Sequence, residues 1–191
     1  MEGIARQQEK QSAGSKEAGT PSTGGIPGVA IREARQDDYD AVAGLMRQAQ
    51  RDHAEALPDR FAATDHVLPQ AWYLSFFGRA TRCILVAEQA EAVVGFAMLE
   101  WHDAAHFPAL TKRRYAHISE FAVDEERHRQ GIGTALFEAC REWAAGHGAQ
   151  QLELKVWEFN EGARSFYEAV GLRTLNRTMT LDLPPSADEP A

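Results

Sequence analysis

The sequence predicts a mixed α/β domain, in which helices cover a central sheet. Strand and helix signals follow one another in the order β-α-α-β-β-β-α-β-α-β, which indicates a hairpin region that leads into a β-α-β crossover. Residues 152–156 alternate strictly between apolar and polar side chains, as in a strand with one buried face. The hydrophobic fraction of 44% is ordinary for a globular protein.

The chain has 191 residues, which fits one domain with short appendages. Residues 1–28 are rich in Gly, Ser, Gln and Glu and poor in large apolar side chains. Burial cannot offset the entropy of ordering such a segment, so we expect a disordered tail. Residues 184–191 are expected to form a second flexible tail, which leaves a domain over residues 29–183.

The first half of the domain is predicted to contain a strand, two helices and a β-hairpin. Apolar residues at helical spacing predict the longer helix, and Asp37 or Asp38 is a candidate cap for its start. Pro69 opens the shorter, aromatic-rich helix. The two strands of the hairpin flank the tight link "QAEA". These elements are expected over residues 29–35, 37–56, 69–80, 82–89 and 92–101.

The second half is predicted to contain a strand, a helix, a strand, a helix and one or two final strands. A loop over residues 102–113 precedes them, and Gly171 ends the last helix. The elements are expected over residues 114–124, 132–145, 150–158, 160–170 and 172–183. The longer helix is expected to bury Ile132, Ala135, Leu136, Ala139, Cys140 and Trp143.

Composition argues against several classes of protein. No apolar run approaches the length of a membrane span, and no secretory signal begins the chain. The two cysteines, Cys83 and Cys140, make a poor disulfide framework, so we expect reduced thiols in a cytoplasmic protein. The net charge of −8 argues against a nucleic-acid binder. His102 and His106 lack a third ligand at a suitable spacing, so we expect no metal site.

A glycine turn, "HRQGIG", precedes the helix expected over residues 132–145. The first N–H groups of a helix have no intrahelical partner and carry its positive dipole end, so this turn suits a diphosphate. Glycine at 131 and 133 permits close approach, and neighbouring arginines add positive charge. A P-loop string is absent. A dinucleotide turn is disfavoured because Leu136 replaces its third glycine and seven residues separate Val123 from Gly131.

The turn resembles the signature [QR]-x-x-G-x-[GA] of the GCN5-related N-acetyltransferase (GNAT) superfamily, with His128 in the first position. The stretches "ISEFAV" and "LELKVWEFNEGARSFYEAVGL" are also similar to family segments, so the resemblance covers roughly residues 29–183. It implies a central, mixed, mostly antiparallel twisted sheet of six to seven strands flanked by about four helices. It also implies acetyl-CoA as co-substrate, no metal, and transfer to a primary amine of a small molecule or peptide. Homodimers are common in the family.

Glu120 is the candidate general base, because it is the only acid inside its strand and alternation sends it opposite Phe121. A solvated or ion-paired glutamate is the alternative. The resemblance implies that Tyr167 protonates the departing thiolate and that Val123 N–H binds the oxyanion. Asn160 either caps its helix or contacts the pantetheine arm. The expected coenzyme A contacts are Phe121, Val123, His128, Arg129, Gln130, Gly131, Ile132, Gly133, Thr134, Asn160 and Tyr167.

Cys140 lies on the apolar face of its helix and is expected in the core, so direct transfer in a ternary complex is the simpler mechanism. The first two helices and the 102–113 loop are expected to select the acceptor. Their acidic and aromatic side chains would suit a cationic amine. Equally, the acids could form a solvated face and the aromatics a core helix. The residues are Asp52, Glu55, Asp59, Asp65, Trp72, Phe76 and Phe77. Two other functions stay open, a non-catalytic acyl-CoA sensor and a nucleotide-dependent oxidoreductase.

Overall fold

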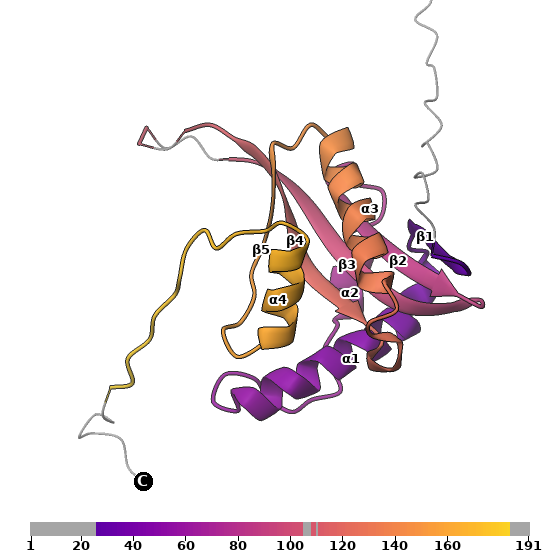
Figure 1. The fold of residues 1–191 in the computed structure, drawn as a ribbon, viewed down its shortest axis with the longest axis horizontal. Helices are drawn as coiled ribbons and strands as arrows, with labels where there is room; N and C mark the ends of the chain where they lie inside the picture. The colour runs from indigo at the N-terminus through magenta and orange to yellow at the C-terminus, as the bar shows by residue number, and fades with distance from the viewer. Residues whose placement is uncertain (1–25, 105–107, 110, 184–191) are drawn as a thin grey trace, which may run out of the picture.

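The computed structural model describes residues 26–104, 108–109 and 111–183. In this part of the chain a five-stranded sheet runs in sequence order, with helices on both faces (Figure 1). The elements are β1 (Val29–Glu33), η1 (Gln36–Asp38), α1 (Tyr39–Ala56), α2 (Gln70–Leu74), β2 (Arg82–Gln89), β3 (Ala92–Asp103), β4 (Arg114–Val123), η2 (Glu125–Arg127), α3 (Ile132–Gly146), β5 (Gln151–Leu154) and α4 (Glu161–Ala169). The tails expected at 1–28 and 184–191 fall outside the described residues, save for 26–28.

The predicted element order is confirmed up to the last helix. Strands β1 to β4 pair antiparallel and β5 pairs parallel with β4, so the sheet is mixed and mostly antiparallel. The prediction of six to seven strands is wrong for the described residues, which form five. Residues 172–183, expected to be one or two strands, form no strand. Their alternating pattern is strand-like, but a strand needs a partner for its backbone groups, and the chain provides none there.

The hairpin predicted around "QAEA" is formed by β2 and β3. Its two turn residues, Ala90 and Glu91, both have positive φ, at 49° and 65°. A two-residue hairpin turn needs this left-handed backbone to match the twist of its strands, and here it is adopted without glycine.

Alternation along β2 and β3 divides the core between the two faces of the sheet. On one face, Val86, Phe96 and Met98 pack with α1 and α2. On the other, Leu85, Ala97 and Leu99 pack with α3. The aromatic side chains of residues 72, 76 and 77 belong to the first core or pack against it, so α2 is the core helix that the sequence left as one alternative.

Helix α3 buries most of the face that the sequence predicted. The predicted residues Ile132, Leu136, Ala139 and Cys140 are buried, whereas Ala135 and Trp143 are only half-buried. The helix also buries Phe137 and Ala144, which the prediction omitted. The wider apolar stripe arises because α3 contacts strands on both sides of its axis.

The start of α1 departs from the expected capping. Asp38 occupies the N-cap position, but its carboxylate makes no cap hydrogen bond to α1. It accepts hydrogen bonds from Arg32 of β1 at 2.7 and 3.0 Å, and the same guanidinium pairs with Glu88 of β2. The Arg32 guanidinium lowers the pKa of Asp38. This ion network joins β1, β2 and the start of α1.

A β-bulge interrupts the ladder between β3 and β4. Leu99 pairs with Ile118 and Met98 pairs with Glu120, so Ser119 is an extra residue. The Ser119 hydroxyl donates to the carbonyl of Met98 at 3.4 Å. Because of the bulge, Ile118 faces α3, whereas Glu120 shares the face of Met98, toward α1.

Candidate functional site

The glycine turn leaves backbone donors open at the start of α3. Gly131 is the N-cap residue, has φ +84°, and has no side chain to cap the helix. The first intrahelical bond runs from Ala135 N–H to the Gly131 carbonyl, at 3.0 Å. The N–H groups of residues 132–134 precede that bond, so they are free to meet a ligand. With the positive end of the helix dipole behind them, they form an anion site.

The side chain of Ile132 anchors the turn in the core. Ile132 is 1% exposed and packs with Val29, Ala87 and Val94 of the first three strands. The polar residues around Ile132 that were predicted to contact coenzyme A are all exposed: Arg129, Gln130 and Thr134. Arg129 also has positive φ, at 59°. A non-glycine residue in this conformation is strained, and such strain collects at ligand-binding turns.

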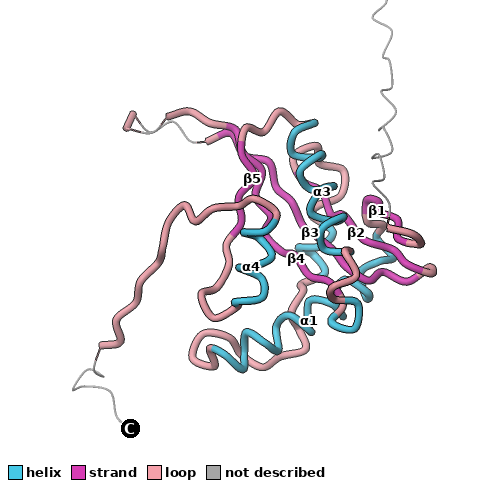
Figure 2. The backbone as a smooth tube through the Cα atoms, in the orientation of Figure 1, coloured by secondary structure: helices cyan, strands magenta, loops and turns pink. Residues whose placement is uncertain are grey.

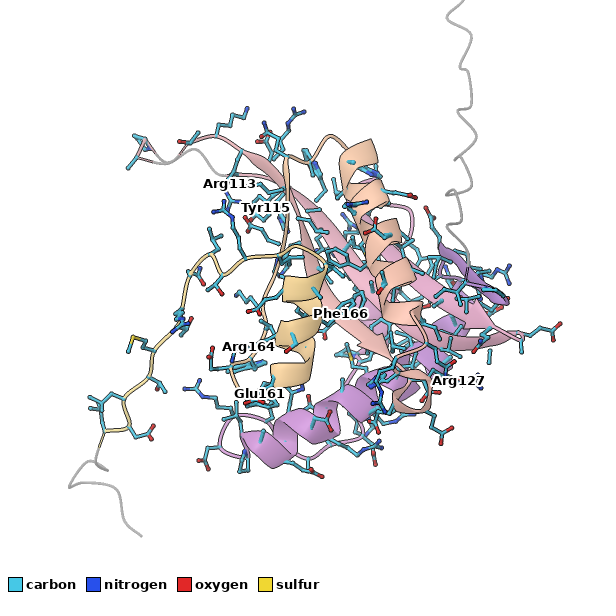
Figure 3. The ribbon with its side chains drawn as sticks, viewed as in Figure 1. Arg113, Tyr115, Arg127, Glu161, Arg164 and Phe166 are labelled. Atoms are coloured by element: carbon cyan, nitrogen blue, oxygen red, sulfur yellow. The ribbon has the colours of Figure 1, made fainter. Side chains whose placement is uncertain are left out.

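Side-chain hydrogen bonds hold the loop between β4 and α3. The ring Nε2 of His128 lies 2.9 Å from the Val123 carbonyl, which only accepts, so this nitrogen is the protonated one. Arg127, labelled in Figure 3, donates to the Gln89 side chain at 2.7 Å. Gln48 of α1 accepts from the Glu125 N–H at 3.4 Å. The loop is therefore tied to β2, to β4 and to α1.

Strands β4 and β5 separate beside this turn. Their parallel ladder covers residues 115–118 of β4 and ends at the pair Ile118–Leu154, one residue before the bulge. Asp124 N–H donates to the Val94 carbonyl, so Asp124 directs its backbone toward β3. Successive residues of an antiparallel strand use opposite edges, so Phe121 and Val123 direct their N–H groups into the gap between β4 and β5. Both donors lie on the edge of β4 that β5 leaves unpaired beyond Ile118.

Glu120 stands on the α1 side of this gap. Burial raises the pKa of its carboxyl from 4.5 to about 7. A carboxylate with a raised pKa binds a proton more readily than an ordinary glutamate. Among the described residues, no cationic side chain forms an ion pair with Glu120. The structure therefore does not support the alternative that Glu120 is an ion-paired glutamate.

Tyr167 stands on the opposite side of the gap, on α4. Its ring lies 6.2 Å from that of Phe121, and the neighbouring Phe166 stacks on Phe121 at 5.8 Å. Figure 3 shows Phe166 on the side of α4 that faces α3, where a Cβ at Gly133 would lie 3.5 Å from its ring. Burial, with smaller effects from Cys140 and Glu120, raises the pKa of Tyr167. The hydroxyl therefore stays protonated at neutral pH.

Asn160 caps α4. Its side-chain carbonyl accepts from the Ala163 N–H at 2.9 Å, which is the capping geometry that the sequence offered as one explanation. The cap fixes the start of the helix that carries Tyr167, seven residues later.

Two features on the α1 side of the sheet were not predicted from the sequence. His53 and Phe61 pack with Phe159 and Trp157, with ring centroids 5.0 to 5.3 Å apart. The sequence has no periodic signal for this contact because the four residues come from α1 and two loops. Nearby, an open pocket of about 420 Å³ is lined by α1 and the following loop, including the predicted acids Glu55 and Asp65.

The remaining polar candidates have structural surroundings. Cys140 is in the core, as predicted, and burial raises its pKa, which disfavours the nucleophilic thiolate. Cys83 is also a buried free thiol. His117 is half-buried, as expected, and burial lowers its pKa, with a smaller effect from His102. His106 lies outside the described residues, and the described ones contain no group of three metal-ligating side chains. Nor does any described helix have the length and apolar character needed to cross a bilayer.

Comparison with protein families gives one match, which covers most of the domain. The model of the acetyltransferase (GNAT) family matches residues 42–172. This range includes both sides of the gap, the glycine turn and α4.

Individual relatives agree with the family match. An N-alpha-acetyltransferase from Sulfurisphaera tokodaii is 28% identical over 75% of this chain and 79% of its own length. A thialysine N-epsilon-acetyltransferase from Bos taurus is 28% identical over 77% of this chain and 85% of its own. The crystal structure of a mutant of the BH1408 protein from Bacillus halodurans superposes with a TM-score of 0.78. It is 30% identical and covers 81% of this chain and 99% of that one.

Proposed function

The chain belongs to the acetyltransferase (GNAT) family, and from this premise we propose that it transfers the acetyl group of acetyl-CoA to a primary amine in one ternary complex. The observation that carries the proposal is the gap between β4 and β5. On one side it has a half-buried glutamate whose pKa is raised to about 7, on the other a protonated tyrosine, and at its end an open helix N-terminus.

Coenzyme A is proposed to lie along the gap on the α3 side. Its diphosphate would accept hydrogen bonds from the N–H groups of residues 132–134, which the glycine turn leaves open. The pantetheine amides would pair with the free edge of β4, next to Phe121. Exposed Arg129 adds positive charge at the mouth of the site.

The amine is proposed to approach from the α1 side, where Glu120 stands. A primary amine near its ordinary pKa of about 10.4 is protonated at neutral pH and must lose a proton to become a nucleophile. Glu120 would accept that proton, and the neutral amine would form a C–N bond to the thioester carbon. Val123 N–H would donate to the resulting oxyanion. When the C–S bond breaks, the thiolate would take the proton of the Tyr167 hydroxyl, and the attacking nitrogen would give its second proton to the tyrosinate, which leaves a neutral amide and a neutral tyrosine.

The acceptor is proposed to be a cationic amine of a small molecule or peptide. The pocket on the α1 side carries Glu55 and Asp65, which attract a positive charge. Arg51 lines the same pocket, but it pairs with Glu125 at 3.5 Å. The names of the two relatives above describe transfer to amino groups, which is consistent with this class of acceptor.

A screen of amines with acetyl-CoA, followed by released thiol, tests the proposal. We expect at least one small or peptide amine to release thiol and gain an acetyl group. A chain that binds acetyl-CoA but transfers to no amine would favour the sensor alternative. Tight binding of NAD or NADP without any response to acetyl-CoA would favour the oxidoreductase.

Tyr167→Phe is expected to lower kcat by about a hundredfold, because the thiolate then leaves without a proton donor. The KM for acetyl-CoA should change little, since the ring and its contact with Phe121 are retained. Thiol release under saturating amine measures both parameters. Tyr115→Phe is a matched control, because Tyr115 stacks on His102 and pairs with β5 away from the gap. Equal losses in the two variants would contradict the role given to Tyr167.

A further inference from the structure

The residues just before β1 form a tight turn, with the sequence Ile26-Pro27-Gly28-Val29. The Ile26 carbonyl accepts from the Val29 N–H at 3.0 Å, and Gly28 has φ +83°. Proline in the second position and a glycine with positive φ in the third are the features of a type II β-turn. The turn reverses the chain ahead of the strand, so Ile26 lies back against the molecule.

Ile26 lies against the glycine turn at the start of α3. Its side chain is half-buried and packs against the buried cluster that includes Ile132. A Cβ built on Gly131 would lie 3.0 Å from the Cδ1 of Ile26 and 3.6 Å from its Cγ1. The isoleucine side chain therefore covers residue 131 on the side where any other amino acid would carry its own side chain.

A second contact joins the same two parts of the chain. Val29 pairs with Gln89 at the end of β2, and the Gln89 side chain accepts from Arg127 at 2.7 Å. Arg127 belongs to the loop that leads from β4 to the glycine turn. Figures 1 and 2 show β1 at the edge of the sheet next to α3, in agreement with these contacts. The start of β1 therefore supports both the loop and the glycine turn.

We propose that Ile26 is a positioning residue for the diphosphate of coenzyme A, which holds the glycine turn in the conformation that leaves the N–H groups of residues 132–134 open. It rests on the function proposed above, because those N–H groups are the donors proposed for the diphosphate. Arg129 is strained at φ +59°, and Gly131 has φ +84°. A strained backbone persists only where its surroundings enforce it. Ile26 precedes residues 42–172, the range of the family match, so this support comes from outside the matched range.

Calorimetric titration with coenzyme A tests the role of Ile26. We expect Ile26→Ala to weaken binding by about tenfold or more, because one misplaced hydrogen bond to a charged group costs at least that much. Ile26→Leu keeps the size of the side chain and is expected to bind with near-native affinity. An Ile26→Ala variant that binds as tightly as the native chain would overturn the inference and leave the proposed function standing. If the native chain itself binds no coenzyme A, the proposed function fails, and the inference fails with it.

Two matched glycine variants test whether the turn before β1 carries the effect. Gly28→Ala and Gly78→Ala both place alanine at positive φ, +83° and +71°, and at both positions no described atom lies within 4 Å of an added Cβ. The two variants should therefore lose similar stability through backbone strain alone, which urea unfolding measures. Only Gly28→Ala is expected to weaken coenzyme A binding, because Gly28 folds Ile26 against the glycine turn, whereas Gly78 lies between α2 and β2. Equal affinities in the two variants would contradict the inference.

Discussion

Glu120→Gln is expected to lower kcat/KM at pH 7 by a factor of about 10² to 10⁴, the usual contribution of a positioned general base. Glutamine keeps the size of the side chain but cannot accept the proton of the amine. In the native chain, kcat/KM should rise with pH through an apparent pKa of about 7, as the half-buried carboxyl of the free enzyme ionises. The variant should lose this rise. Thiol release from acetyl-CoA between pH 5.5 and 9 measures both effects.

Glu100→Gln is the control for this result. Glu100 lies on β3, on the same face of the sheet as Glu120, but its carboxylate pairs with Arg82 at 3.0 Å. Its neutralisation is expected to leave the pH profile unchanged. A profile that keeps its pKa near 7 in Glu120→Gln would assign the base to another group or to water.

Glu120→Gln is also expected to stabilise the fold at high pH. Burial raises the pKa of Glu120 in the folded chain, so the folded state favours the protonated form. The stabilisation that this preference gives is fully present below the ordinary pKa of 4.5. It is lost as the pH rises through the folded-state pKa of about 7. The difference between these values corresponds to at most about 3 kcal/mol, at 1.36 kcal/mol for each factor of ten. Urea unfolding at pH 4.5 and pH 8.5 should show that the Glu120→Gln variant gains stability relative to the native chain only at the higher pH.

Gly131→Ala is expected to weaken binding of coenzyme A by at least about tenfold, equal to 1.4 kcal/mol. Residue 131 has φ +84°, and a Cβ there would meet Ile26 Cδ1 at 3.0 Å. Alanine is strained in this left-handed conformation, so the turn is expected to relax and to move the N–H groups of residues 132–134 from the positions proposed for the diphosphate. Calorimetric titration with coenzyme A measures the affinity. The left-handed conformation should also cost about 1–2 kcal/mol of stability in an alanine variant.

Gly148→Ala is a control that separates the effect of backbone strain from the effect on coenzyme A binding. Gly148 also has positive φ, +71°, and follows the opposite end of α3, where a Cβ would lie 3.5 Å from Arg114. A similar loss of stability is expected without any loss of affinity. If both variants bind coenzyme A equally well, the diphosphate is not held at the glycine turn.

The sequence contained enough information to predict the elements whose partners are adjacent along the chain. The hairpin of β2 and β3 follows from two alternating runs and a short link, and the open start of α3 follows from the glycines at 131 and 133. Glu120 could be placed opposite Phe121 because that relation depends only on alternation. Its pKa could not be predicted, since it depends on which side chains from other elements cover it.

The incorrect predictions concern relations between distant segments. The alternation in residues 150–158 predicted a longer strand, but β5 has four residues because its ladder with β4 ends at Ile118. Residues 179–183 alternate as strictly and form no strand, because a period of two states which face is apolar and not which strand lies beside it. The aromatic contact of His53 with Phe159 likewise joins segments that no local pattern relates.

The bulge at Ser119 makes the pairing of β4 as important as its composition. If the strand were straightened with Ser119 in place, Ser119 would pair with Met98 and residues 120–123 would turn over, so that Glu120 would point among the apolar side chains beneath α3 and Phe121 toward the proposed amine. Replacement or removal of Ser119 leaves Glu120 opposite Met98 and therefore keeps its orientation. The side of the sheet that Glu120 faces is thus set by register, a constraint that no single side chain reveals.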